Sequence, residues 1–216
     1  GYDSLFYNIM AINAFYIFLL ATVVGEFLVP FILKFFYKNY DWRKMAMSVL
    51  GSPESPVRHI YRLWLLWLGV VLTYTAFVYY EAAKPISPTL ASIEFIEILA
   101  FAIGAGVLSG LFSVNEQKDS LTLSAKIHGV GAAIGFMLLL FFPLTNSILE
   151  LKCGNTTVGF VKIGAFLLAL TSFIFFVMSD KERFRNTFIN NEGLWEQLAL
   201  FFMYVPFVVD TTMKLW

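Results

Sequence analysis

The chain has 216 residues, of which 59% are hydrophobic and only 14% charged, and its mean hydropathy is +0.74. A soluble domain carries about 25% charged residues, so this composition excludes a water-soluble protein and indicates an integral membrane protein. The 15 basic and 15 acidic residues cancel, which argues against a nucleic-acid partner because such a partner needs a basic surface.

Six apolar stretches are each long enough to cross a bilayer core of about 30 Å, which needs about 20 residues of helix. In chain order they are Leu5–Leu33, Leu63–Tyr80, Leu90–Phe112, Ile127–Leu149, Val158–Met178 and Gly193–Leu215. We therefore expect an all-α fold in which residues 1–216 form one domain, a bundle of six transmembrane helices. The first stretch is too long for the apolar core of a cleavable signal, and we interpret it as a span.

The connections between the spans predict the orientation of the bundle. Six basic residues lie between positions 34 and 62, two between the third and fourth spans (one of them Lys118), and three between the fifth and sixth spans, eleven of the fifteen in all. Because loops rich in lysine and arginine stay in the cytoplasm, we predict that these connections are cytoplasmic and that both termini lie outside. We place the protein in the cell membrane (plasma or inner membrane).

Small residues four positions apart occur in the third and fourth spans, as Gly106 with Gly110 and Gly131 with Gly135. Such pairs let helix backbones approach closely in lipid. The connection between these two spans is short, so we predict that they are antiparallel neighbours that pack through these glycines.

His128 stands at the start of the fourth span, directly before those glycines, in the stretch KIHGVGAAIGF. Helical spacing places it on the glycine face, where Ser109 and Ser113 from the end of the third span are expected to lie nearby. We predict that the histidine ring contacts a polar group from another span, with Glu196 as the first choice. The alternative is a histidine that faces headgroup water and serines that only permit close packing.

Polar and ionisable residues within the spans form two groups. A charged side chain inside a bilayer is costly, so it usually faces a cavity or a partner. The inner cluster, at the predicted cytoplasmic end, is a candidate ligand-binding site made of His128, Glu196, Glu26, Arg62, Ser109 and Ser113. The outer cluster contains Glu94, Glu97 and Asp210, with Lys162 as a further candidate. For the outer cluster, an ordinary place at the membrane interface is the simpler alternative.

The sequence offers no motif for a cofactor or a metal. Haem between helices needs paired axial ligands, and the second histidine, His59, lies in a predicted cytoplasmic connection. Cys153 is the only cysteine, so there is no cysteine–histidine metal motif and no internal disulfide. A serine–histidine–acid triad would lack a recognisable nucleophile motif. We expect no cofactor and no metal, and whether the protein is an enzyme stays open.

Four short motifs resemble a known family in their order and spacing. They are SVLGSPESP before the second span, GVLSGLFSVNEQKD at the end of the third, IHGVGAAIGF at the start of the fourth and GLWEQL at the start of the sixth. Together they resemble the prokaryotic six-span membrane proteins called domain of unknown function 998. Ser113 and Gln197 depart from the family's proline and arginine, and Asn115 or Glu116 takes its acidic position.

The resemblance implies a six-helix bundle and no particular activity. It also singles out Gly51, Pro56, His128, Gly129 and Glu196, all at the predicted cytoplasmic end.

Three functions fit these observations. In the first, the protein binds a membrane lipid or another amphiphile in a polar-lined cavity near the cytoplasmic leaflet, as the inner cluster suggests. In the second, it is a small carrier or channel for a solute or proton, although we expect no broken helix near the midplane of the kind that carriers use. In the third, it is a non-catalytic subunit of a membrane complex or a homo-oligomer, as the glycine-rich faces suggest.

Overall fold

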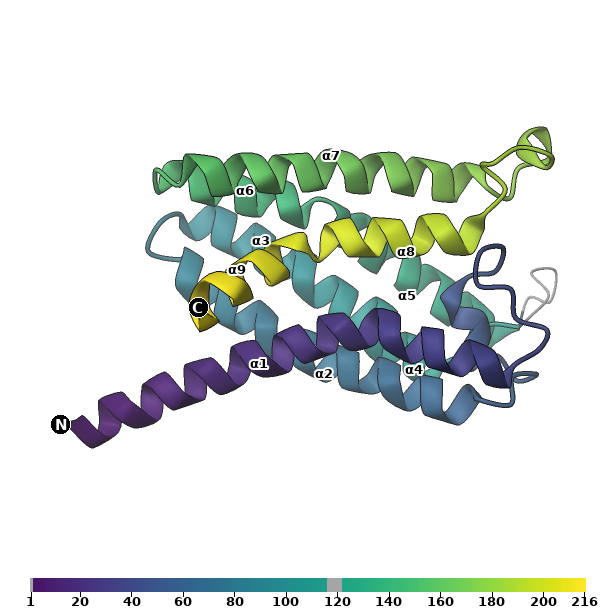
Figure 1. The fold of residues 1–216 in the computed structure, drawn as a ribbon, viewed down its shortest axis with the longest axis horizontal. Helices are drawn as coiled ribbons and strands as arrows, with labels where there is room; N and C mark the ends of the chain where they lie inside the picture. Colours follow the sequence, from purple (N-terminus) through teal and green to yellow (C-terminus); the bar gives the residue numbers. More distant parts are fainter. Residues whose placement is uncertain (1, 116–121) are drawn as a thin grey trace.

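The computed structural model describes residues 2–115 and 122–216, and every regular element in these residues is helical (Figure 1). Glu116 and Lys118, used in the sequence interpretation, lie outside the described residues. Within the described residues, five helices are long and apolar enough to span a membrane, and a bent pair near the C-terminus makes a sixth if it counts as one span. The predicted all-α bundle is confirmed, and the protein is a multi-pass membrane protein.

The helices follow the predicted apolar stretches closely. Their bounds are α1 Tyr2–Leu33, α2 Arg58–Ala83, α3 Pro88–Phe101, α4 Ser109–Leu111, α5 Leu123–Leu140, α6 Phe142–Lys152, α7 Thr156–Met178, α8 Glu192–Met203 and α9 Val205–Leu215. A π-helical turn, η3 (Ala102–Leu108), joins α3 to α4, and the 3-10 turns η1 (Lys34–Phe36), η2 (Met47–Gly51) and η4 (Glu182–Phe184) lie in the connections.

Capping groups decide where the third span begins and ends. The Ser87 side chain accepts a hydrogen bond from the backbone N–H of Leu90 at the start of α3, as serine commonly does before a helix. At the other end, the Arg62 guanidinium donates to the carbonyl oxygens of Gly110 (2.9 Å) and Leu111 (2.7 Å). These carbonyls lack a partner within the helix, so Arg62 fixes the end of the third span against α2.

Three of the six predicted spans contain a local irregularity in the described residues, and the sixth is also bent by more than 40°, so the expectation of no broken helix is wrong for that span. The third contains the π-turn η3, the fourth breaks between α5 and α6 just before Pro143, and the sixth breaks at Tyr204 before Pro206. Proline lacks a backbone N–H and its ring clashes with the preceding turn. The axes of α8 and α9 consequently differ by 41°.

The glycine pairs are close-packing positions, but the pairing differs from the predicted one. Gly131 and Gly135 do face the third span, where Gly131 meets the backbone of Gly104. Gly106 faces α2 instead, and a Cβ added to it would lie 2.6 Å from the Cα of Gly69. Gly110 also faces α2. The π-turn changes the helical register inside this span, so an unbroken helical wheel assigns these glycines to the wrong neighbour.

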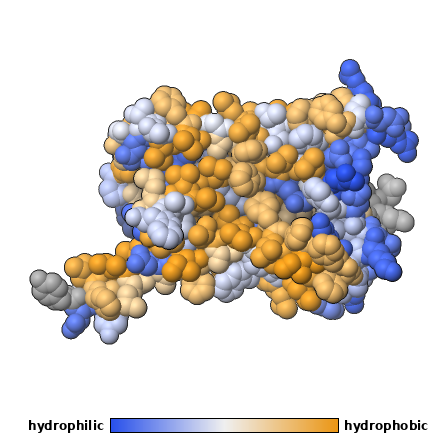
Figure 2. Space-filling view, viewed as in Figure 1, coloured by the Kyte–Doolittle hydropathy of each residue, from blue (hydrophilic) through white to orange (hydrophobic). Residues whose placement is uncertain are grey.

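The two ends of the bundle differ in polarity. Both chain ends lie at the left in Figure 1, and the connections 34–57 and 179–191 lie at the right. We call the right-hand end, which carries these lysine- and arginine-rich connections, the basic end, and the other the opposite end. Hydrophilic residues gather at the basic end, whereas the sides of the bundle are mainly hydrophobic (Figure 2). This surface matches a bundle surrounded by lipid.

The predicted orientation can be tested by chemical labelling. Cys153, at the opposite end, is free and exposed, so a membrane-impermeant maleimide added to intact cells should label it. A variant that combines Cys153→Ser with Lys181→Cys, which places an exposed thiol at the basic end, should be labelled only after the membrane is permeabilised. The reverse pattern would show that the basic end faces outward.

Candidate functional site

A cavity of about 870 Å³ lies inside the bundle at the basic end. Most of its lining is apolar, with Leu65, Leu68, Phe101, Phe136 and Phe173 among the contributors. Its polar lining residues are Glu26, Lys44, Ser48, Tyr61, Ser109, Asn115, His128, Glu192 and Glu196. Several of these come from the connection 34–57 or from the first turns of α5 and α8, so the cavity is polar near the basic end and apolar deeper in the bundle.

The cavity also reaches the side of the bundle, between α5 and α7. Gly129, Ala133 and Met137 of α5 and Val177 of α7 line it, and all four are exposed. Met137 is 55% exposed and Val177 is 48% exposed. The surface here is apolar, so this side of the cavity is suited to contact with the hydrocarbon of a bilayer.

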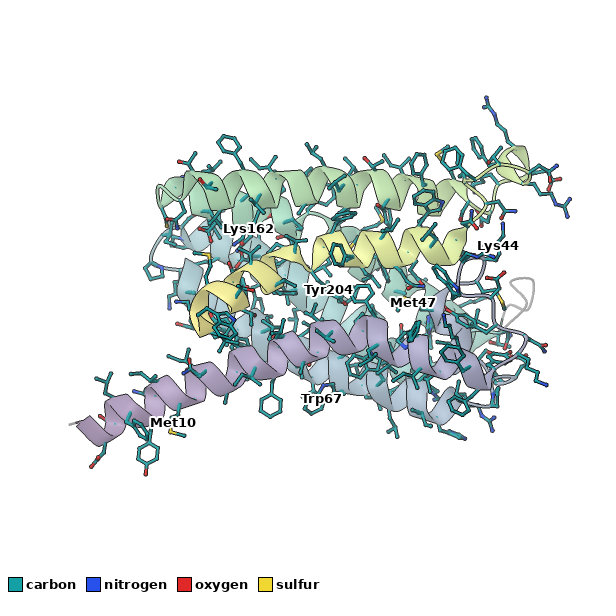
Figure 3. The ribbon with its side chains drawn as sticks, in the orientation of Figure 1. Met10, Lys44, Met47, Trp67, Lys162 and Tyr204 are labelled. Atoms are coloured by element: carbon teal, nitrogen blue, oxygen red, sulfur yellow. The ribbon has the colours of Figure 1, made fainter. Side chains whose placement is uncertain are left out.

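Glu26 lies in the cavity wall and is held by a tyrosine of the broken sixth span. Its side chain is 2% exposed, and its Oε2 accepts a hydrogen bond of 2.8 Å from the hydroxyl of Tyr204. Tyr204 occupies the break between α8 and α9, near the middle of the bundle (Figure 3). The break therefore positions a hydrogen-bond donor beside the deepest acid of the inner cluster.

Glu196 holds the connection 34–57 against α8. Its Oε1 accepts a 2.6 Å hydrogen bond from the backbone N–H of Met47. The backbone N–H of Leu194 donates to the carbonyl of Arg43 at 3.2 Å. A side chain at Gly193 would collide with the carbonyl oxygen of Trp42. The motif GLWEQL is thus the docking surface for this connection, whose residues 44–49 form one wall of the cavity.

The connection 34–57 also buries a tyrosine near Glu196, outside the cavity lining. Tyr40, in the same connection, is 7% exposed. Burial raises the pKa of its hydroxyl, and the nearby Glu196 and Asp41 carboxylates raise it further, because an ionised phenol would lose hydration beside other anions.

The hydrogen bond from His128 to another span goes to the backbone at the end of the third span, and not to one of the polar side chains predicted as its partner. Its ring Nδ1 lies 2.8 Å from the carbonyl oxygen of Phe112, to which it donates, and the side chain is 6% exposed. The hydrogen bond ties the start of α5 to the end of the third span. His128 and Glu196 line the same cavity, and a direct pairing between them stays a prediction.

The structure brings together four of the six residues of the predicted inner cluster: Glu26, Ser109, His128 and Glu196. Arg62 and Ser113 lie outside the cavity lining. Arg62 caps the third span, and the carbonyl of Ser113 accepts a hydrogen bond from the Ser124 hydroxyl at 3.0 Å. Both residues connect neighbouring helices and do not face the cavity.

The other residues singled out by the family motifs also lie at the basic end. Gly129 lines the cavity, and a Cβ there would meet nothing within 4 Å, so the glycine leaves open space beside His128. Gly51 packs against Tyr61, where a Cβ would lie 3.3 Å from the ring, whereas Pro56 is exposed.

A layer of buried aromatic rings lies beyond the cavity. Phe142 and Phe207 have ring centroids 4.9 Å apart, Tyr79 lies 5.6 and 5.4 Å from them, and Phe101 lies 6.0 Å from Tyr204. Phe101 also lines the cavity. These five residues, at most 7% exposed, form what we call the aromatic layer, and they separate the cavity from the polar residues of the opposite end.

The outer cluster assembles on the far side of the aromatic layer, around Lys162 (Figure 3). Lys162 is 0% exposed, and its Nζ lies 2.7 Å from Asp210 Oδ1 and 2.9 Å from Glu150 Oε1. Asp210 also accepts a 2.6 Å hydrogen bond from the hydroxyl of Tyr79. Glu94 lies within electrostatic reach of this group. The predicted outer residues therefore gather, with Lys162 at their centre.

Sequence reasoning missed several members of both clusters. They are Tyr204 and Met47 at the cavity and Tyr79, Thr145, Asn146 and Glu150 in the outer cluster. Two of them had a usable signal, since Tyr204 and Thr145 stand within two residues of Pro206 and Pro143, which break their spans. Among the described residues, no group of three or more His, Cys, Asp or Glu side chains is arranged to hold a metal ion.

One comparison with known proteins gives a match. The family described as "Protein of unknown function (DUF998)" matches residues 19–211, a stretch that contains the cavity, the aromatic layer and the outer cluster. No curated protein and no solved structure matches the chain. Because the match extends over nearly the whole chain, and as the four sequence motifs indicated, the protein belongs to the DUF998 family of proteins of unknown function.

Proposed function

We propose that the protein binds a membrane amphiphile, a molecule with a hydrocarbon chain and a polar head, in the cavity at the basic end. The observation that carries the proposal is a cavity with an apolar interior and a polar end, whose lining includes exposed apolar residues of α5 and α7. An amphiphile entering from the bilayer would keep its chain in apolar surroundings and bring its head to hydrogen-bonding groups.

The charges of the lining favour a particular kind of head group. Glu26, Glu192 and Glu196 contribute carboxylates, whereas Lys44 is the cationic side chain of the lining, and its Nζ donates to the carbonyl of Asn190 at 2.6 Å. An excess of acceptors favours a head that donates hydrogen bonds, such as a polyol or an amine. A phosphate would meet acidic groups. We place this binding at the cytoplasmic leaflet of the cell membrane, following the positive-inside rule.

Filling part of the cavity should remove the bound amphiphile. Ala132 of α5 lines the cavity, and Ala132→Trp would fill the space next to it. The matched control is Ile134→Trp, on the same helix at a position that is 53% exposed and outside the lining. Native mass spectrometry after mild detergent extraction should show a retained amphiphile in the wild type and the control, and at least a tenfold loss in Ala132→Trp.

Two outcomes would contradict this function. One is a wild-type protein that carries no amphiphile and gains no thermal stability from polyol- or amine-headed lipids. The other is an Ala132→Trp protein that is as stable as the wild type and retains the amphiphile, which would mean that the cavity is not the binding site.

A carrier is the second candidate, and the broken helices favour it. The breaks at Phe141 and Tyr204 lie at the aromatic layer, where the ring of Phe142 meets that of Phe207, and polar groups lie on either side. Broken helices beside a central site are common in transporters. Uptake of a solute by proteoliposomes, lost when Tyr204 is replaced by Phe, would favour transport over amphiphile binding alone.

A further inference from the structure

The acids Glu94 and Glu97 of the outer cluster are buried beside neutral partners. They lie one turn apart on α3 and are 1% and 4% exposed. Their hydrogen bonds come from α6, where the amide of Asn146 donates to Glu94 Oε2 at 3.0 Å and the hydroxyl of Thr145 lies 2.9 Å from Glu97 Oε2. Neither of these partners carries a charge that could balance a carboxylate.

The buried cation of the outer cluster is already engaged by two other acids. Lys162 forms ion pairs with Asp210 and Glu150. The titratable groups near the pair, from each packed element, are Tyr79 of α2, Glu150 of α6, Lys162 of α7 and Asp210 of α9. Glu94, Glu150 and Asp210 thus lie near one ammonium group, and Glu97 adds a fourth acid beside Glu94. Ionisation of all four would leave a surplus of three negative charges.

The hydrogen-bond acceptors around Glu97 outnumber the hydrogens that the neighbouring side chains can donate. Thr145 has one hydroxyl hydrogen, yet its Oγ1 lies within hydrogen-bond distance of both Glu97 Oε2 and the carbonyl oxygen of Phe141 (3.2 Å). In addition, Glu97 Oε1 and Asn146 Oδ1 are buried, and neither has a hydrogen-bond partner among the described residues. Both side chains are at least 95% buried. A buried acceptor without a donor is costly, and more so when it belongs to a charged group, so Glu97 is better accommodated here as a neutral acid than as a carboxylate.

We propose that Glu94 and Glu97 form a proton-binding site, in which Glu97 carries a proton at neutral pH. The added proton turns the Glu97 carboxylate into a carboxylic acid, which donates its O–H to Thr145 and frees the Thr145 hydroxyl to donate to Phe141. It also removes the repulsion between two neighbouring carboxylates in surroundings of low dielectric constant. The side chains of Glu150 and Asp210 are 20% and 18% exposed, so the cluster reaches the surface at the opposite end, where protons are exchanged.

Infrared spectroscopy of the protein in lipid vesicles tests this site. At pH 7 the wild type should show the C=O stretching band of a protonated carboxyl group, and the band should be absent in Glu97→Gln. The matched control, Glu81→Gln, changes an exposed glutamate of α2 at the same end and should retain the band. The band should be the same whether the cation of the buffer is choline or Na⁺, because the site is proposed to bind a proton and not sodium.

Three results would overturn the proton site. They are a wild type without the band, a band that persists in Glu97→Gln, and a band that Na⁺ removes, which would identify a sodium site. If Glu97→Gln fails to fold, a hydrophobic carbodiimide, which reacts with protonated carboxyl groups, gives the answer on the wild type. Peptide mass spectrometry should then find the adduct on Glu97, and an unmodified Glu97 would count against the proposal. Amphiphile binding at the basic end is measured separately, so either proposal can fail alone.

Discussion

Replacing Lys162 with methionine is expected to lower the free energy of unfolding by about 3 kcal/mol, the lower end of the range for breaking a buried ion pair. Methionine fills a similar volume but leaves Asp210 and Glu150 without their cation. The lower end applies because these two side chains are each about a fifth exposed, so water can hydrate them in part. Unfolding by SDS in mixed micelles, followed by circular dichroism, measures the change.

Two further variants distinguish the effect of losing these ion pairs from a general effect of replacing a lysine on stability. Lys152→Met, at an exposed position of α6 near the same end, should change stability by less than about 0.5 kcal/mol. The double variant Lys162→Met with Asp210→Asn should recover part of the loss, because the better buried of the two orphaned acids becomes neutral. A Lys162→Met protein as stable as the wild type would mean that the ion pairs contribute nothing to the fold.

The helices of this fold follow from hydropathy alone. Each predicted apolar stretch coincides to within a few residues with an observed helix or a run of consecutive helices, from α1 at Tyr2–Leu33 to α9 at Val205–Leu215. A segment in hydrocarbon must satisfy its backbone hydrogen bonds within itself. An apolar stretch of about 20 residues does so by forming a helix. Orientation in the membrane depends on loop charge and stays a prediction.

The neighbours of each helix were harder to predict than the helices. Gly106 and Gly110 were assigned to the interface with the fourth span, and both face α2. The cause is the π-turn at Ala102–Leu108, in which the Ser109 hydroxyl donates to the carbonyl of Gly104, five residues earlier. Nothing in the composition of this stretch marks an extra residue in the turn, because the turn is stabilised by packing against other helices.

Candidate site residues were predictable where polarity in an apolar segment exposed them. Glu26, His128 and Glu196 are conspicuous for that reason, and all three line one cavity. Their partners were not predictable, since Glu26 bonds to Tyr204 and Glu196 to the backbone of Met47, 178 and 149 residues away in the chain. A backbone N–H carries no sequence signal, and a tyrosine among 39 aromatic residues in the chain carries little.

Gly104→Ala is the second change for which we expect a large loss of stability, about 2–3 kcal/mol, because an inserted methyl group in a tight interface forces the backbones apart. An added Cβ would collide with the carbonyl oxygen of Gly131. That atom belongs to the backbone of α5, so it cannot move away as the end of a flexible side chain would. The two helices must separate or tilt, and close helix packing is a main source of stability in lipid.

The glycines of this protein provide a graded control for that prediction. At Gly131, a Cβ would lie 3.2 Å from the Gly104 carbonyl oxygen, so Gly131→Ala should cost less than Gly104→Ala. At Gly164 in α7, a Cβ would meet nothing within 4 Å, and alanine there should be neutral or stabilising by up to about 1 kcal/mol because it favours the helix. Melting temperatures of the three variants in one detergent should follow that order. Equal losses at Gly104 and Gly164 would mean that glycine is needed for helix flexibility, and that contact between the third span and α5 is not the cause.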